Sequence, residues 1–214
     1  MKVELIEHMG SDLTVVNAAR VSFAKEHKEF MNTDFNLIRY LAKHKHWSPF
    51  AHCFVQFRIK APIFVARQLG KHQVGLCWNE ISRRYVNYTP EFWEAEKGWR
   101  EATADKKQGS GRLSPFQRDM DRMMDIVHHT CLRNYQQALD MDICEEQARA
   151  FLPQSMLTEW IWSGSLFAFS RVCNLRMSED AQKETEEIAL QIDKICATLY
   201  PHCWNALTKG EEDE

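Results

Sequence analysis

The sequence predicts an α+β fold, with one domain built on a central antiparallel or mixed sheet that is flanked by helices. Several segments repeat apolar residues at helical spacing, whereas few alternate as strands do. Helices and strands do not alternate regularly along the chain, which argues against a parallel α/β sheet. A length of 214 residues suits one domain with a single substantial core. We therefore assign residues 1–209 to one domain and 210–214 to an acidic, disordered tail.

The first quarter of the chain is predicted to form two strands and two helices. Residues 1–7 alternate enough for an opening strand, and Ser11 is a candidate N-cap of the helix that follows. A second helix is expected over 34–44, and it should end near Ser48-Pro49 because the residue before proline avoids helical geometry. Residues 53–59 alternate strictly, which indicates a half-buried strand whose apolar face carries Cys53, Val55, Phe57 and Ile59.

The next predicted element is a helix from Ile63 to about His72, after a proline that suits the first turn. Residues four apart lie on the same face of a helix. The end of this helix is therefore expected to bring Gln68, Lys71 and His72 into one neighbourhood. Gly75 is the expected break.

The second half of the chain is predicted to be mainly helical. Residues 89–114 are polar and indicate an exposed loop, and Ser114-Pro115 is expected to start a long helix that ends near Asp140. Asp142 and Glu145 resemble a capping box for a short helix that carries Arg149. Bulky residues over 156–162 predict a strand, and two more helices are expected, over 166–175 and 180–200.

Charge and cysteine content limit the function classes. A formal net charge of -3 argues against a sequence-independent DNA or RNA binder. No run approaches the roughly 18 apolar residues of a membrane span, and the first residues lack the apolar core of a signal peptide, so we expect a cytoplasmic protein. The seven cysteines form no C-x-x-C pair and are odd in number, which indicates reduced, mostly buried thiols.

The segment RQLGKHQVGLCWNEISRRY gathers cations, amides, a carboxylate, a hydroxyl and a thiol between two apolar runs. This density suits an anionic ligand that carries a heterocycle. Arg84, Arg149 and Arg176 come from separate segments, and an arginine holds a phosphate through two parallel hydrogen bonds. The alternative for each arginine alone is a pair with a surface carboxylate.

Two other chemistries are less favoured by the residues. The histidines 44, 46, 52 and 72 have no acidic or cysteine partner at a ligand spacing, so we expect no metal site. Cys77 has basic neighbours that would favour its thiolate, but a small buried side chain is the simpler interpretation because no local Cys-His signature is present. Neither G-x-G-x-x-G nor G-x-x-x-x-G-K-[ST] occurs, which argues against a Rossmann or P-loop nucleotide site.

The motif NEISRRY, with KHQ before it, resembles the signature R-H-R-x-x-S-x-N-E-x-S-x-R-Y of the flavin-dependent thymidylate synthases. NAARVSF, FRIKAPIFVARQ, ARAFLP and the NLR that ends at Arg176 also resemble segments of that family, in order, from about residue 9 to residue 200. The resemblance implies reductive methylation of dUMP to dTMP. It further implies methylenetetrahydrofolate as carbon donor, FAD as redox cofactor, NADPH as reductant, and a homotetramer with active sites shared between subunits.

The resemblance also implies roles for single residues. Arg176 would be catalytic, since it would face the uracil and favour the ring ionised at N3. The dUMP contacts would be Gln68, Lys71, Glu80, Ser82, Arg83, Arg84, Arg149 and Arg176. The FAD contacts would be Ser22, His46, Ser48, Lys71, His72, Gln73, Asn79, Glu80, Ser165 and Arg171. Because reduced flavin supplies a hydride in this family, the resemblance weakens the case for Cys77 as a nucleophile.

The motif departs from the family pattern on the flavin side. KHQ replaces R-H-R, Cys77 stands near the expected serine, and the spacing to N-E is one residue longer, with Trp78 as the extra residue. These changes keep three alternatives open. The chain could transfer another one-carbon group, such as hydroxymethyl, to the pyrimidine. It could be a nucleotide-binding relative without flavin, or a helical scaffold whose cations only form salt bridges.

Overall fold

The computed structural model describes residues 1–103 and 109–210 and confirms the predicted α+β class. Four strands form one sheet in the order β1-β2-β4-β3. Every pair of neighbouring strands in this sheet is antiparallel. The strands are β1 (Lys2–Met9), β2 (Phe54–Pro62), β3 (Leu76–Glu80) and β4 (Leu157–Ser165). The sheet is therefore antiparallel, which settles the choice that the sequence left open.

Eight α-helices and three 3-10 turns complete the described part of the chain. The helices are α1 (Asp12–Arg20), α2 (Asn32–Lys43), α3 (Ile63–Leu69), α4 (Gln117–Asp140), α5 (Glu145–Ala148), α6 (Leu166–Arg176), α7 (Lys183–Leu199) and α8 (Pro201–Thr208). The 3-10 turns are Val21–Phe23, Pro49–His52 and Arg149–Phe151. Within these described residues, no helix combines the length and apolar composition that crossing a bilayer requires.

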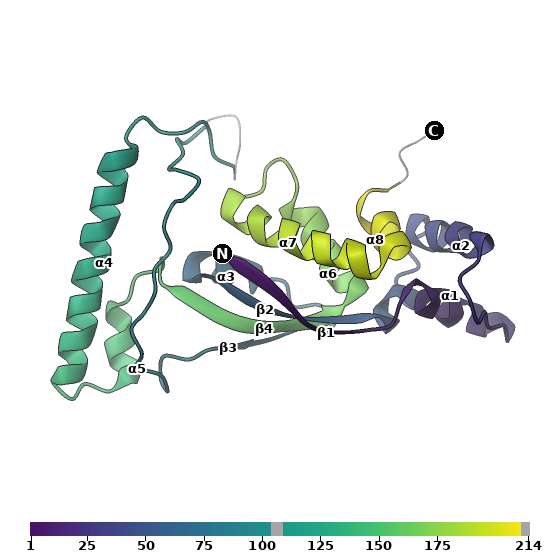
Figure 1. Ribbon diagram of the computed structural model, residues 1–214, viewed down its shortest axis with the longest axis horizontal. Helices are drawn as coiled ribbons and strands as arrows, with labels where there is room; N and C mark the ends of the chain where they lie inside the picture. The colour runs from purple at the N-terminus through teal and green to yellow at the C-terminus, as the bar shows by residue number, and fades with distance from the viewer. Residues whose placement is uncertain (104–108, 211–214) are drawn as a thin grey trace.

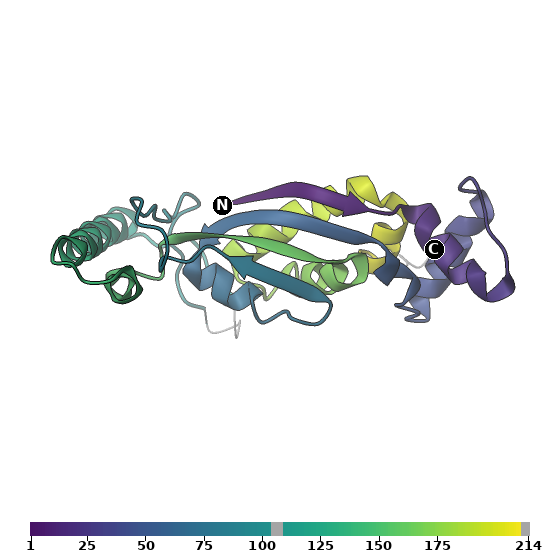
Figure 2. The ribbon, with the colours of Figure 1, turned by 90° about the horizontal axis from the view of Figure 1, so that it is seen from below.

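One face of the sheet is covered by helices and the other is open. In Figure 1, α6, α7 and α8 lie on one side of the strands, and Figure 2 shows the strands in front of these helices. The predicted apolar face of β2 is confirmed, because Cys53, Val55, Phe57 and Ile59 are all buried. The open face carries polar side chains such as Arg58 and Glu159, which form an ion pair at 2.9 Å. Such a half-covered antiparallel sheet accounts for the strict alternation of β2.

A separate arm projects from one end of the sheet. Figure 1 shows α4 standing away from the sheet, with α5 beside it. The arm has its own small core of Tyr135, Ala138 and Ala148. The predicted tail falls mostly on residues 211–214, and part of the predicted loop falls on 104–108, both of which lie outside the described residues.

Two predicted helix boundaries and one strand differ between the sequence prediction and the structure. The helix α3 ends at Leu69 rather than near His72, and the N–H of Gly70 closes its last turn on Ala66. Residues 76–80 form the edge strand β3, which is not predicted from the sequence because five residues of mixed polarity show no clear period. The predicted helix over 180–200 begins three residues later and ends at Leu199, before Pro201 starts α8.

The expected capping box at Asp142 is also wrong. Asp142 has a φ of 58°, a left-handed conformation that follows the end of α4. An N-cap residue has an extended backbone instead. Cys144 therefore stands at the N-cap of α5.

Candidate functional site

A cavity of about 440 Å³ lies between α3, the turn after it and the edge strand β3. This volume falls within the range of about 300–1,000 Å³ that is usual for small-molecule sites. Its polar lining comes from Arg67, Lys71, His72, Gln73 and Glu80, and Trp78 adds an aromatic ring. The cavity therefore joins two cations, an amide, an imidazole and a carboxylate within the densely polar segment of the sequence.

Arg176, the last residue of α6, contacts His72, one of the residues that line this cavity. Its Nε donates a hydrogen bond to Nε2 of His72 at 2.9 Å. Burial lowers the pKa of His72 below its ordinary value, and the charges of Arg176 and Arg171 lower it further. Burial also lowers the pKa of Arg176, but an arginine remains protonated in proteins. The pair is therefore a neutral imidazole against a guanidinium cation.

Glu80, at the end of β3, is held in place on two sides. It accepts hydrogen bonds from the indole Nε1 of Trp78 at 3.2 Å and from the hydroxyl of Thr158 at 2.7 Å. Trp78 in turn stacks on the buried Trp160, with ring centroids 4.3 Å apart. One face of Trp78 is therefore packed against the sheet core, and its edge fixes the carboxylate at the cavity.

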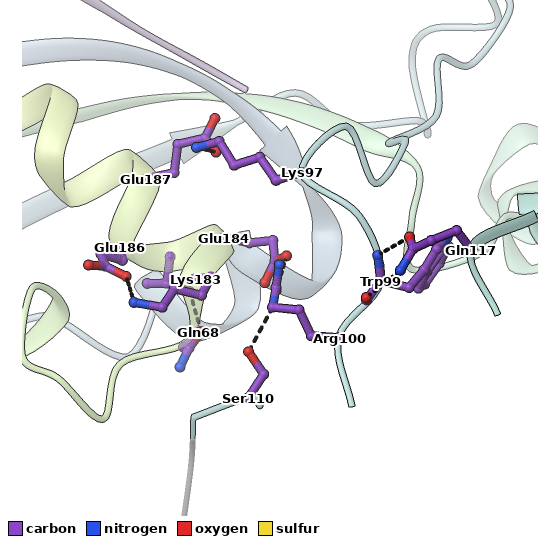
Figure 3. Close-up of polar contacts among 11 residues, drawn as sticks. Gln68, Lys97, Trp99, Arg100, Ser110, Gln117, Lys183, Glu184, Glu186 and Glu187 are labelled. Atoms are coloured by element: carbon purple, nitrogen blue, oxygen red, sulfur yellow. Dashed lines mark hydrogen bonds and ion pairs between the residues drawn. The ribbon is translucent and has the colours of Figure 1, made fainter. Parts of the chain in front are cut away.

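Gln68 precedes Lys71 and His72 on the same turn, where its carbonyl accepts the N–H of Lys71 at 3.3 Å, but it is not among the residues that line this cavity. Its amide Nε2 donates to Gln182, and its Oε1 accepts from the buried hydroxyl of Thr185. Both partners lie at the start of α7, and Figure 3 shows Gln68 beside that helix end. The helical spacing of residue 68 placed it correctly on α3, but the polar partners on α7 decide where its amide points.

A segment of the polar loop is anchored next to Gln68. Arg100 forms an ion pair with Glu184 and donates to the hydroxyl of Ser110 at 2.7 Å. Lys97 pairs with Glu187 at 2.5 Å. Figure 3 shows these loop residues facing the first turns of α7. The loop between β3 and α4 is thus tied to the same helix end that holds Gln68.

Arg84 and Arg149 are not among the residues that line this cavity. Arg84 is exposed after β3, where its Nε donates to the hydroxyl of Ser82 at 3.0 Å. Arg149 is exposed before β4 and donates to the carbonyl of Glu146 at 3.1 Å. Both guanidinium groups thus keep donors for a ligand.

Arg83 differs from its neighbour because its side chain is buried. The guanidinium stacks over the ring of Tyr88 at 4.3 Å and donates to the carbonyl of the same residue. Arg83 therefore shapes the loop after β3 through its side chain.

The residues predicted to contact FAD are spread over several elements. Lys71, His72, Gln73 and Glu80 line the cavity. Ser22, His46, Ser48 and Asn79 are exposed, as is Arg171 on α6. Ser165 is buried at the N-cap of α6, where its hydroxyl accepts the N–H of Ala168 at 3.2 Å.

Cys77 is exposed on β3, so the expectation of a buried side chain is wrong. It lies between Leu76 and Trp78, which turn to the other face of the strand because successive strand residues alternate. All seven cysteines are free thiols, and four of them are buried.

Some supporting residues carry no signal that the sequence alone would show. Thr158, Trp160, Gln182 and Thr185 hold residues of the site, yet each is far from its partner in the sequence. No local motif marks such residues. A polar side chain such as Thr185 on the buried face of an amphipathic helix was the one available hint, since buried polar groups need partners.

Comparisons with known proteins agree on one family. Residues 4–202 match the family model described as thymidylate synthase complementing protein. A flavin-dependent thymidylate synthase from Thermotoga neapolitana is 34% identical over 207 residues, which cover 97% of this chain and 90% of the relative. The same-named protein from Treponema denticola is 36% identical over 215 residues, covering 99% of this chain and 80% of the relative.

A solved structure has a similar fold. The UMP/dUMP methylase PolB from Streptomyces cacaoi, bound with 5-Br dUMP, superposes with a TM-score of 0.87 at 31% sequence identity. The match covers 96% of this chain and 93% of that chain. The same methylase bound with 5-Br UMP also has a TM-score of 0.87, at 29% identity.

Proposed function

Because this chain belongs to the family of the flavin-dependent thymidylate synthases, we propose that it methylates C5 of dUMP to make dTMP. The observation that carries the proposal is the contact of Arg176 with His72, which lines the polar cavity. It places a cation, with a neutral partner, beside a cavity of nucleotide size. The relatives are named thymidylate synthases and a UMP/dUMP methylase, which favours methyl transfer over the hydroxymethyl alternative.

The proposed role of Arg176 is electrostatic. Uracil is a poor nucleophile at C5 until negative charge develops on its ring. A fixed cation next to a ring carbonyl or an ionised N3 stabilises that charge, and such stabilisation often lowers the reaction barrier more than any other single effect. Within the described residues, Arg176 forms no ion pair with a carboxylate, so its charge remains available to a substrate.

The flavin is proposed to be FAD. The donors of the cavity fit such a cofactor, since Lys71 offers a cation for its pyrophosphate, and His72 and Gln73 offer groups that bind polar ring edges. Bound there, FAD would supply the hydride of the reaction, with methylenetetrahydrofolate as carbon donor and NADPH as reductant. The exposed Ser22, His46, Ser48 and Asn79 would complete the contacts.

The active form is proposed to be a homotetramer with shared sites. Arg84 and Arg149 lie outside the lining of the cavity next to which Arg176 contacts His72. One chain therefore does not assemble the full set of dUMP contacts by itself. The arm helix α4 exposes the apolar residues Met123, Ile126 and Val127, and such a patch suits contact with another copy. A neighbouring protomer would then bring Arg84, Arg149 and the Ser82 hydroxyl to the phosphate.

The decisive experiment combines a flavin spectrum with product analysis. The purified protein should be yellow and show flavin absorbance bands. With dUMP, methylenetetrahydrofolate and NADPH, it should form dTMP, identified by mass. UMP should be tested in parallel, because the structural relative also binds 5-Br UMP.

Other outcomes would favour the alternatives. A colourless protein whose melting temperature rises with dUMP would be a nucleotide-binding relative without flavin, since a ligand of the native state must stabilise it. A protein with neither flavin nor a dUMP-induced rise would contradict the proposal and leave the scaffold interpretation. The predicted cytoplasmic location is an independent prediction that microscopy of the tagged chain would check.

A further inference from the structure

We propose that His72 is a positioning residue for Arg176, holding the guanidinium by its Nε so that both terminal NH2 groups stay free for the substrate. This inference rests on the proposed catalytic role of Arg176. It adds to the expected flavin contact of His72 a second task, which the Nε–Nε2 distance of 2.9 Å supports.

The direction of the hydrogen bond determines the state of the imidazole. The Nε of an arginine always carries a hydrogen and can only donate. Nε2 of His72 must therefore carry a lone pair, so the single ring proton sits on Nδ1. A protonated imidazole has no lone pair at all, and it would place a second positive charge against Arg176. The contact exists only with neutral His72.

The surroundings keep His72 neutral. The helix α6 contributes two cations, Arg171 and Arg176, and both lower the pKa of His72 in addition to its burial. Two further cations line the cavity, Arg67 on α3 and Lys71 in the turn that follows α3. The one carboxylate of the cavity lining, Glu80 on β3, is occupied by Trp78 and Thr158.

Other contacts of Arg176 do not explain its position. Among the described residues, His72 is the only side chain that forms a hydrogen bond with its guanidinium. Arg176 is also the last residue of α6. Without an acceptor at residue 72, the long side chain would regain rotational freedom, and misplacement of a catalytic group lowers the rate.

The first test compares two substitutions of His72, one that removes the hydrogen-bond acceptor and one that keeps an acceptor. His72→Leu removes the acceptor, whereas His72→Gln places an amide oxygen near the site of Nε2. A hydrogen bond to a charged group is worth enough that we expect kcat to fall about 10-fold or more in His72→Leu. His72→Gln should keep a clearly larger share of kcat. Rates are compared per bound flavin, measured by absorbance, because His72 is also an expected flavin contact.

The pH profile separates positioning from packing. For the wild type, kcat should fall as the pH drops through the lowered pKa of His72, below its ordinary value of about 6.5. His72→Gln cannot gain this proton, so it should lack that acid limb. Equal kcat per flavin in His72→Leu and wild type, or an unchanged acid limb in His72→Gln, would overturn the inference.

A second test does not depend on turnover. In nitrogen-15 histidine spectra of the full-length protein, His72 should show an unprotonated Nε2 and titrate below the ordinary value. Arg176→Gln should raise this pKa more than the matched variant Arg171→Gln does, since Arg176 contributes more to the shift. A protonated Nε2, or an equal rise in both variants, would overturn the pair. An intact signature in a protein that makes no dTMP would support the pair and overturn only the proposed function.

Discussion

Arg176 and His72 stand 104 positions apart in the sequence and meet through one hydrogen bond. At the scale of single residues, Arg176 is the cation of this contact and His72 is its acceptor. The carboxylate of Glu80 is oriented by hydrogen bonds from Trp78 and Thr158. The chemistry of the site therefore depends on a small number of oriented side chains.

Removing the Arg176 cation should affect turnover more than binding. We expect Arg176→Ala to lower kcat by about 100-fold, because loss of one charge-stabilising group typically costs that much. The dUMP dissociation constant, measured by titration calorimetry, should change less than kcat. Wild-type turnover in this variant would remove Arg176 from the catalytic role.

The Cys77 thiol should be dispensable. Cys77 is exposed on an edge strand, and exposed positions of this kind tolerate substitution with changes of about 0.5 kcal/mol or less. Cys77→Ser should therefore retain kcat within about 2-fold of the wild type. Steady-state kinetics at saturating dUMP checks this, with circular dichroism as the control for folding. Complete loss of turnover in a folded variant would contradict this prediction and support Cys77 as a catalytic nucleophile.

At the scale of elements, the segment between α1 and α2 shows how buried polar groups position a loop. Asp34 is fully buried and accepts hydrogen bonds from Arg20 at 2.8 Å, from His27 at 2.8 Å and from the N–H of Met31 at 3.0 Å. Asn17 binds both the N–H and the carbonyl of His27. This segment carries Ser22, one of the expected flavin contacts, so its anchoring matters for the site.

Asp34→Asn should destabilise the fold by about 3 kcal/mol at neutral pH, because it removes one partner of a largely buried ion pair. Burial acts to raise the pKa of Asp34, but hydrogen bonds from His27 and Arg20 outweigh it and lower that pKa. The stabilisation is therefore present above the unfolded value of about 3.9 and is lost as the pH falls through the lower folded pKa.

Urea unfolding across that pH range would measure this effect. The difference between wild type and Asp34→Asn should be full near pH 7 and shrink towards the acid limit. Glu29→Gln, an exposed carboxylate of the same segment, is the matched control and should change stability little. A difference that stays constant down to the acid limit would contradict the assigned role of the Asp34 charge.

At the scale of the whole molecule, the arm and the sheet present different surfaces. The sheet and α6, α7 and α8 enclose the main core, whereas α4 buries only Tyr135 and Ala138 along its length. Figure 1 shows this helix far from α6, which carries Arg176. An arm with so little of its own packing is well suited to contact another subunit.

Assembly should depend on the apolar face of this arm. Ile126 is 57% exposed on α4, so Ile126→Asp should leave the protomer folded but weaken the tetramer and turnover together. Size-exclusion chromatography with light scattering would measure the mass, and Ile126→Leu, which keeps an apolar surface, is the control. An Ile126→Asp protein with wild-type mass and activity would place this face outside the interface.

The local periods of the chain were sufficient to predict most elements of the fold. Burial on one face produces a period of two in β2 and of about 3.6 in α2 and α7, and both patterns are visible within a few residues. The ordered motifs also sufficed for the family, since residue types at fixed spacings identify it without coordinates. These properties are local, and a linear chain displays them directly.

The partners of each functional group were decided by packing between distant segments. No pattern near residue 68 shows that Thr185 and Gln182 hold its amide, and none near residue 72 shows that Arg176 donates to its imidazole. The edge strand β3 likewise exists because β4 offers it a partner, not because its own five residues favour a strand. Hydrogen-bond partners this far apart in the chain carry no local signal, because any compatible donor elsewhere satisfies the same group.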